Sequence, residues 1–313
     1  MHSATASTPG GIGNLGPGLD VLGCAIAGAR DIVNATWHDR PGITILDAGH
    51  ADLPTHSSRH SSALAAAAVL NCALRKGITF DAAGIALAVQ KGLPLSGGQG
   101  GSAASAVAGA VAVDALLGAH LESQALLECC LVAEAKVSGR HLDNIAPQLL
   151  GGIVLIRSID PVDVVKLPVP HGLHIVIAQP SQKLSTSRAR RALPPTVPLA
   201  IAVHQMAQTA AIVAACFRND LALFGRAIDD RIAEPVRAPL IPGFIEAKAA
   251  ALGAGALGTS ISGAGPAIFA VCDSKESGTA IYQAMCESYA KLEIECHGFV
   301  TTVDEQGTTV VVE

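Results

Sequence analysis

The chain has 313 residues, of which 50% are hydrophobic and only 15% are charged, so it has ample apolar surface for sizeable cores and does not resemble a disordered protein. Its formal net charge is −5 and its longest basic cluster is Arg188-Ala189-Arg190-Arg191, so we expect neither nucleic acid nor a membrane as a partner. The eight cysteines are scattered without a CxxC pair and the first residues show no leader pattern, which favours a cytoplasmic protein without zinc.

Short β-branched runs alternate with apolar helical runs, which predicts a mixed α and β chain. The predicted strands are 31–38, 43–46, 84–90, 153–159, 173–178, 258–262, 267–271, 293–300 and 308–312. The predicted helices are 61–76, 102–117, 122–137, 144–150, 199–230, 244–252 and 275–290. We expect helices to cover one face of each sheet, and we interpret the Pro-containing turn 160–170 as the domain boundary. The most apolar stretches, 63–70 and 103–113, are shorter than the about 20 residues of a membrane span.

Three glycine-rich segments stand out, at 10–20, 94–104 and 262–266, and each alone also fits a simple turn. Segment 94–104 leads directly into an Ala-rich helix, whose unpaired N–H groups and positive dipole end form an anion site that glycines let a ligand approach closely. It is neither a Walker A loop, since no Gly-Lys-Ser/Thr occurs, nor a Rossmann fingerprint. We interpret it as a phosphate loop in which Ser102 can reach a metal ion, with a purely structural loop as the alternative.

A polar segment, 134–147, interrupts apolar surroundings. Glu134 follows Leu, Cys, Val and Ala in its helix and is either a solvated residue or a carboxylate for Mg²⁺. Asp143 either caps the next helix or, with His141, belongs to a polar cluster for a hydroxyl-bearing substrate. The histidines at 50, 56 and 60 lie in a Ser-rich stretch, for which we favour a solvated loop over a metal site.

Taken in order, these segments resemble the GHMP kinase superfamily and, within it, the homoserine kinase family, over nearly the whole chain. The resemblance is carried by Asn-Leu-Gly-Pro-Gly-Leu-Asp (14–20), the loop 94–104, His-Leu-Asp-Asn-Ile-Ala-Pro (141–147), Ser-Thr-Ser-Arg-Ala-Arg-Arg-Ala-Leu-Pro (185–194), Glu-Pro-Val-Arg-Ala-Pro-Leu-Ile-Pro-Gly (234–243) and Ser-Gly-Ala-Gly-Pro (262–266). The phosphate loop points only to the superfamily, whereas the segments around Asn144, Arg190 and Arg237 point to homoserine.

The resemblance implies an α+β, two-domain GHMP kinase fold. Residues 1–163 would form an ATP-binding domain like ribosomal protein S5 domain 2, and residues 164–313 a ferredoxin-like domain. It further implies a homodimeric, cytoplasmic transferase that uses ATP and Mg²⁺ to convert L-homoserine to O-phospho-L-homoserine, a step toward threonine.

The resemblance also implies roles for individual residues. ATP would contact Pro94, Gly97, Gly98, Gln99, Gly100, Gly101, Ser102, Ala103 and Ser62. Mg²⁺ would be held by Ser102 and Glu134, since it prefers oxygen ligands. The amino acid would be bound by Asn14, Asp20, Asn144, Arg190 and Arg237, with Asp20 facing its ammonium and the guanidinium groups its carboxylate. Asn144 and Asp143 would be catalytic, Asp143 either as a base or by orienting Asn144.

The sequence departs from the family pattern at four positions. In the loop, Gln99 and Gly101 replace a Leu and a Ser, and Ser62 stands where an Asn that contacts adenine is expected. Leu19 replaces a Phe, which is a conservative core change. Two alternatives therefore stay open: a GHMP-type kinase for another small hydroxylated metabolite, and a catalytically weak relative that binds a metabolite. The pair Arg190 and Arg237 argues against an isoprenoid alcohol, which has no carboxylate.

Overall fold

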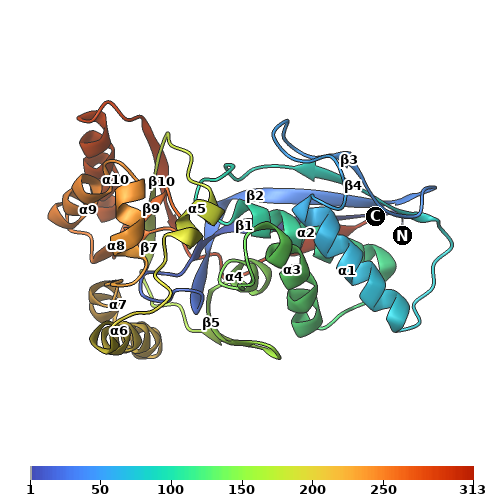
Figure 1. The fold of residues 1–313 in the computed structure, drawn as a ribbon, viewed down its shortest axis with the longest axis horizontal. Helices are drawn as coiled ribbons and strands as arrows, with labels where there is room; N and C mark the ends of the chain where they lie inside the picture. The colour runs from blue at the N-terminus through green and yellow to red at the C-terminus, as the bar shows by residue number, and fades with distance from the viewer. Residues whose placement is uncertain (1) are drawn as a thin grey trace.

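The structure, a computed structural model, describes residues 2–313 as two β-sheets with helices packed against them (Figure 1). The first sheet has the strand order β11-β1-β2-β4-β3, and β5 and β6 extend it from β2. Its strands are β1 (Ser3–Gly13), β2 (Leu22–His38), β3 (Gly42–Asp47), β4 (Gly84–Gln90), β5 (Ile153–Ile159), β6 (Val162–Leu167) and β11 (Thr309–Val312). Since β11 pairs antiparallel with β1, the end of the chain returns to the first sheet, where both termini lie side by side in Figure 1.

Four helices pack against the first sheet. They are α1 (Ser61–Arg75), α2 (Gly101–Leu117), α3 (Ser123–Val137) and α4 (Ile145–Leu150). The Ala-rich α2 is buried between β1 and β2 on one side and α1 and α3 on the other, which its small side chains permit. Gly109 makes this close packing possible, because a Cβ at that position would lie 2.6 Å from the carbonyl oxygen of Ser62 in α1. The sheet and α2 thereby fix where the glycine-rich loop before α2 must lie.

The second sheet has the antiparallel order β10-β7-β9-β8, which is the βαββαβ arrangement of a ferredoxin-like domain, as the family resemblance implied. Its strands are β7 (His174–Pro180), β8 (Gly258–Ile261), β9 (Ile268–Cys272) and β10 (Cys296–Thr302). The helices α9 (Phe244–Gly253) and α10 (Lys275–Ala290) cover one face and enclose a core around Phe244, Met285 and Tyr289.

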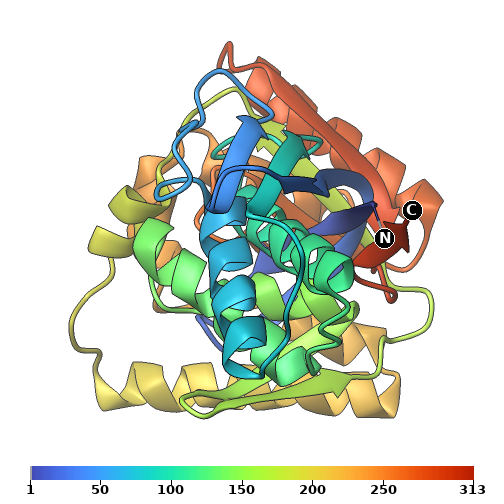
Figure 2. The ribbon, with the colours of Figure 1, turned by 90° about the vertical axis from the view of Figure 1, so that its right-hand side faces the viewer.

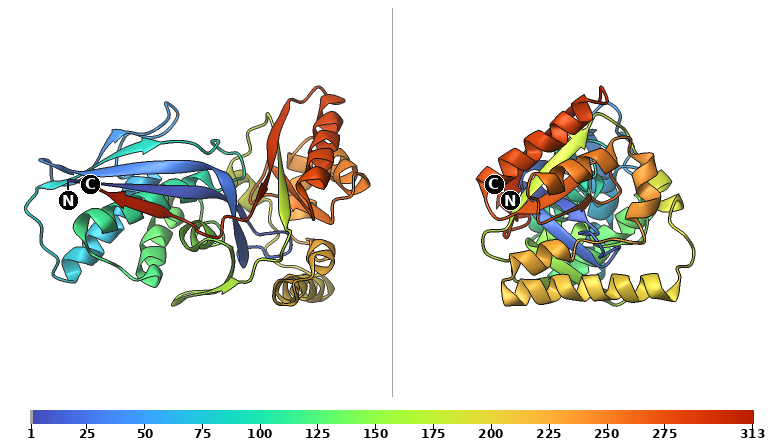
Figure 3. Two further views of the ribbon diagram at one scale, coloured as in Figure 1. Left: turned by 180° about the vertical axis from the view of Figure 1, so that it is seen from behind. Right: turned by 90° about the vertical axis from the view of Figure 1, so that its left-hand side faces the viewer.

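A third core joins the two sheets. Ile12 and Leu22 of the first sheet pack in one cluster with Ile177 and Phe269 of the second. The cluster includes residues of α6 (Leu199–Arg218) and α7 (Leu221–Arg226), which Figure 3 shows at the lower end of the second sheet. The region between the sheets is thus continuously packed, and loops from both sheets meet at its edge.

Most predicted elements are confirmed, but several expectations were wrong or incomplete. Segment 160–170 is not only a turn, because β6 forms a hairpin with β5. The predicted helix 199–230 ends at Arg218, where Asn219 is left-handed, and α7 follows. The sequence patterns missed β1, the first half of β2, and the short helices α5 (Thr186–Arg191), α8 (Glu234–Arg237) and η1 (Ala238–Leu240). The division between residues 163 and 164 stays a prediction; it would fall within β6.

Among the described residues 2–313, α6 is the one helix that is long and apolar enough to cross a membrane by length and composition, with a mean hydropathy of 1.5. The shorter apolar stretches that the sequence emphasises are the buried helices α1 and α2. Polar residues interrupt α6, and Gln205 fastens it to the rest of the protein by donating to the carbonyl of Pro17 and to Asp230. Most of its opposite face is exposed. Figure 2 shows α6 running along the lower edge of the molecule.

Candidate active site

A cleft of about 460 Å³ opens where the loop before α2 meets loops of the second sheet, a size suited to small-molecule ligands. Its lining includes the glycine-rich residues 97, 98, 100 and 101, the first turn of α2, the end of α3, and the loops 183–187 and 263–265. The second and third glycine-rich segments, far apart in the chain, therefore face the same space.

The backbone of this loop is oriented by the protein behind it. Four consecutive carbonyl oxygens accept hydrogen bonds: Gly98 from Ser262 Oγ (2.7 Å), Gln99 from Gly11 N (3.0 Å), Gly100 from Gln148 Nε2 (3.1 Å) and Gly101 from Lys91 Nζ (2.9 Å). Within residues 2–313, the N–H groups of Gly98 to Ser102 find no acceptor. A row of free N–H donors at the N-terminus of a 17-residue helix is an anion site.

Gly100 shows why the loop is rich in glycine. It caps α2 with a left-handed φ of 68°, and a Cβ there would lie 2.6 Å from Asn144 Oδ1 and 2.7 Å from Gln148 Nε2. Any side chain would therefore push Asn144 away from the loop. The absence of a side chain lets Asn144, from the start of α4, lie directly against the phosphate loop.

Unsatisfied polar atoms gather around the first turn of α2. Ser102 Oγ, Glu134 Oε2, Asn144 Oδ1 and Gln148 Oε1 are buried and have no hydrogen-bond partner among the described residues. Burial raises the pKa of Glu134 to about 7, and the nearby Asp143 adds to this while His141 opposes it. Buried polar groups in native proteins nearly always have partners, so four orphans in one place indicate a site for a polar ligand.

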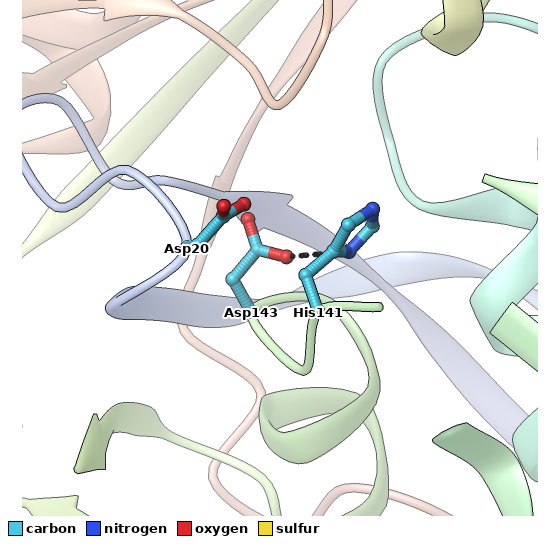
Figure 4. A group of neighbouring side chains, drawn as sticks. All are labelled: Asp20, His141 and Asp143. Atoms are coloured by element: carbon cyan, nitrogen blue, oxygen red, sulfur yellow. Dashed lines mark ion pairs between the residues drawn. The ribbon is translucent and has the colours of Figure 1, made fainter. Parts of the chain in front are cut away.

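His141 and Asp143 form a buried ion pair, with 3.1 Å between Nδ1 and Oδ1 (Figure 4). Although burial alone would lower the pKa of His141, its contact with Asp143 dominates and raises that pKa to about 9. His141 is thus neither a solvated residue nor a free base. Asp20, His141 and Asp143 each bring a donor atom within 4.8 Å of the others, which makes this the most strongly charged part of the site.

The N-terminal glycine-rich segment reaches the same place. Asn14 N donates to Asp143 Oδ2 at 2.9 Å, and Asn14 Oδ1 accepts from Asp20 N at 3.2 Å. Asn14 and Asp20 both have positive φ angles, 68° and 60°, a strained conformation that is concentrated at functional sites. At Gly13 a Cβ would lie 2.6 Å from Asp143, so this glycine permits the contact between the two segments.

The two predicted arginines have different surroundings. Arg190, on α5, makes a two-pronged ion pair with Asp20, with N–O distances of 2.8 and 2.6 Å. Arg237, on α8, is 4% exposed and donates only to the carbonyl oxygens of Gly263 and Ala189. No carboxylate of residues 2–313 lies within ion-pair distance of Arg237, and burial lowers its pKa. A buried guanidinium without an acidic partner is costly unless a ligand supplies the anion.

Most residues that the sequence singled out line the cleft or lie beside it. Those beside it reach the lining residues His141 and Gly263 through the contacts described above, and they are Asn14, Asp20, Asp143, Arg190 and Arg237. Two further side chains point elsewhere. Gln99 is 4% exposed and its side chain bonds Gln179 rather than facing the cleft. Ser62 is fully buried, its hydroxyl pairs with His60, and it does not line the cleft. His60 is itself buried, in contrast to the solvated loop expected for it. Sequence reasoning missed Lys91, although it stands directly before the glycine-rich loop.

Comparisons with known proteins identify a family to which the whole chain is similar. The model of the GHMP kinases N terminal domain matches residues 63–152, and that of the GHMP kinases C terminal domain matches residues 212–291. The chain is 36% identical to a homoserine kinase of Chlorobaculum tepidum, with 99% of each chain covered. It is 40% identical to a homoserine kinase of Arabidopsis thaliana, over 99% of this chain and 85% of that protein. A crystal structure of homoserine kinase from Cytophaga hutchinsonii superimposes with a TM-score of 0.92 at 39% identity, covering 99% of this chain and 98% of that one.

Proposed function

Because this chain belongs to the homoserine kinase family of the GHMP kinases, we propose that its cleft transfers the terminal phosphoryl group of ATP to the hydroxyl of L-homoserine. The products are ADP and O-phospho-L-homoserine, the latter a precursor of threonine. The observation that carries this proposal is the juxtaposition of two anion sites of different kinds. Free backbone N–H groups at α2 suit phosphates, and the buried, unpaired Arg237 suits a carboxylate.

The residues present also fit Mg²⁺. Ser102 Oγ and Glu134 Oε2 are both buried oxygen atoms without partners beside the loop, and oxygen is the ligand type that Mg²⁺ requires. When bound there, the ion would neutralise charge on the phosphates. Glu134 contributes the negative charge of the site, and the raised pKa of the unliganded carboxyl is consistent with a group that awaits a cation.

We propose that the zwitterionic amino acid inserts into the ion pair between Asp20 and Arg190. In the structure these two charges satisfy each other. An incoming ammonium group would replace Arg190 at Asp20, and the carboxylate would bridge the released Arg190 to Arg237. A metal ion suits the cluster of Asp20, His141 and Asp143 less well, because Asp20 already holds Arg190 and His141 carries a pKa of about 9. A ligand with only one charge would separate Asp20 from Arg190 but could pair with only one of them.

Catalysis in this arrangement relies on position and charge. Phosphoryl transfer passes through a loose transition state, so alignment of the hydroxyl with the phosphate supplies much of the acceleration. Asn144 lies against Gly100 of the loop and beside Gly13, and this position supports a role between the proposed phosphate and amino acid sites. Asp143 already accepts the backbone N–H of Asn14 and contacts His141, and these contacts favour an orienting role over a role as a strong base.

One assay tests the proposal. Release of ADP would be measured with L-homoserine, with other hydroxy amino acids, and with a homoserine analogue that lacks the carboxylate. We expect L-homoserine to give the highest kcat/KM and the analogue to react poorly. A preference for another hydroxylated metabolite would assign a different substrate, and ATP binding without turnover of any acceptor would support the alternative of a catalytically weak relative.

We further propose that the enzyme is a homodimer in the cytoplasm. All eight cysteines are free, which suits a reducing compartment, and the exposed face of α6 offers an apolar surface for a second copy. The division of the chain into an ATP-binding part and a ferredoxin-like part near residues 163 and 164 is likewise proposed. It is supported by the separate strand orders of the two sheets.

A further inference from the structure

Asp31 lies outside the cleft but contacts both ends of the loop that forms it. It is a fully buried residue of β2. Its Oδ1 accepts the backbone N–H groups of Gly92 and Leu93, both at 3.1 Å, where the loop leaves β4. Its Oδ2 accepts Ser105 Oγ at 2.7 Å, in the first turns of α2 where the loop ends. One carboxylate therefore spans a loop of about ten residues.

Lys91 completes this network. Its side chain is 6% exposed, and its ammonium group donates to Asp31 Oδ2, to Gly101 O (2.9 Å) and to Ser105 Oγ (2.9 Å). An ammonium group has three N–H donors, and these partners use all three. Lys91 therefore has no free donor for a phosphate, although it lines the cleft. Its position fits a residue that holds the loop rather than one that touches the nucleotide.

We propose that Asp31 and Lys91 form a buried clamp that sets the path of the phosphate loop and thereby controls the affinity for ATP. The inference rests on the proposed placement of ATP on this loop. Glycines 97, 98, 100 and 101 would otherwise leave the loop mobile, and ordering it would cost binding free energy. The clamp orders it in advance. Lys91 also turns the Gly101 carbonyl toward the protein, which helps leave the N–H groups of the loop for the ligand.

A matched ion pair on the same strand provides the control. Arg30 precedes Asp31, so its side chain leaves the opposite face of β2. It donates to Asp304 Oδ2 at 2.6 Å and to the carbonyls of Ser7 and Gly307. This second network ties the sheet to the C-terminal segment and makes no contact with the phosphate loop. Its loss should affect stability alone.

The test compares the double variant Asp31→Asn with Lys91→Met against Arg30→Met. Removing both charges avoids leaving one of them buried without a partner. ATP affinity would be measured by calorimetry without homoserine, together with KM for each substrate and the midpoint of urea unfolding. We expect the double variant to bind ATP at least tenfold more weakly while KM for homoserine changes less than threefold. Arg30→Met should lower the unfolding midpoint and leave ATP affinity unchanged.

Each outcome of these measurements either supports or overturns the proposed clamp. Equal ATP affinity in the double variant and the natural enzyme overturns the clamp, as does an equal loss in Arg30→Met. If the double variant does not fold, Ser105→Ala is used, because it keeps both charges and removes only one link. Weaker ATP binding by two- to fivefold is then expected, and unchanged binding overturns the clamp. A natural enzyme that fails to bind ATP at all would instead refute the proposed function.

Discussion

At the scale of single residues, Arg237 carries the case for an amino acid substrate. Truncating one partner of a buried charge pair costs about 2–5 kcal/mol. Arg237→Ala should therefore lower kcat/KM for L-homoserine by roughly 30-fold to a few thousand-fold, since each 1.4 kcal/mol is a factor of ten. ATP affinity should hardly change, because we propose that the phosphates bind at the loop before α2, away from Arg237. Steady-state kinetics and calorimetry measure the two effects separately.

The homoserine analogue without a carboxylate is the control for Arg237. It lacks the carboxylate that the guanidinium is proposed to bind, so Arg237→Ala should reduce its expected low turnover little further. Equal losses with both substrates, or a loss of ATP affinity as large as that for homoserine, would contradict a carboxylate-binding role for Arg237.

Glu134 is expected to lower the stability of the folded protein while supporting its activity. Burial raises its pKa from 4.5 to about 7, so the folded protein disfavours the ionised carboxylate. This penalty is absent below pH 4.5, grows between pH 4.5 and 7, and is complete above pH 7. Without Mg²⁺ and ATP at pH 8, Glu134→Gln should raise the free energy of unfolding by on the order of 1–3 kcal/mol. The variant should lose most activity at saturating Mg²⁺; near-natural kcat would refute its role with the ion.

The sequence singled out many residues that the structure brings close together, but it did not predict their burial or their partners. Asn14, Asp20, Asn144, Arg190 and Arg237 stand in segments whose order and residue types are informative. That Asp20 and Arg190 are paired could not be predicted, because it depends on how α5 is placed against the loop 14–20 in the folded protein. The burial of Ser62 likewise follows from the close packing of α1 on α2, which no local pattern encodes.

At the scale of elements, the glycines of the phosphate loop differ in whether a side chain can replace them. Gly101 begins α2, and a Cβ there would meet Lys91 Nζ and Pro94 O only at 3.4 Å, a contact that needs little or no movement. Gly101→Ser should therefore leave ATP affinity unchanged or raise it. Gly100→Ser is the matched change, and it should weaken ATP binding strongly, because its left-handed φ and its contact with Asn144 exclude a side chain. Calorimetry on both variants distinguishes them. Much weaker binding in Gly101→Ser would show that this position also requires glycine.

The strands β1 and β6 escaped prediction for different reasons. β1 reads Ser-Ala-Thr-Ala-Ser-Thr-Pro-Gly-Gly-Ile-Gly, which has few of the large β-branched and aromatic residues that mark strands. It forms a strand because it lies between β2 and β11 and its small residues face α2. The prolines on either side of β6 suggested a turn, so the strand between them was not predicted. In contrast, β4, β5 and α10 have clear periodicity, and their predicted bounds coincide with those of the structure.

At the scale of the whole molecule, the α+β class and the ferredoxin-like second half followed from the alternation of elements and from the family resemblance. The extent of contact between the halves did not. Ile12 and Phe269 are more than 250 residues apart and share one core. The packing of this core fixes the positions of the loops of the two sheets relative to each other. The cleft at the edge of the core therefore depends on both halves of the chain.

The exposed face of α6 is an apolar surface whose partner the fold does not show. Leu199, Val203, Met206 and Phe217 are 52–78% exposed, and Ala207, Ala210 and Ala214 lie between them on the same face. In two copies related by a twofold axis at the helix midpoint, Val203 would face Ala214 and Met206 would face Ala210 or Ala211. Over the middle of the helix large residues would then meet small ones, which is the self-complementarity that a symmetric dimer requires.

If the proposed homodimer forms through this face, the natural enzyme should have about twice the 31.6 kDa mass of one chain in light scattering after gel filtration. Met206→Glu should shift it to the monomer mass, because it would bury two uncompensated carboxylates in an apolar interface. Ile245→Glu is the matched control, since Ile245 is 64% exposed on α9, away from α6. It should leave the mass unchanged. A monomeric natural enzyme would exclude the homodimer, whereas a dimer that survives Met206→Glu would place the interface elsewhere, and α6 would then need another apolar partner.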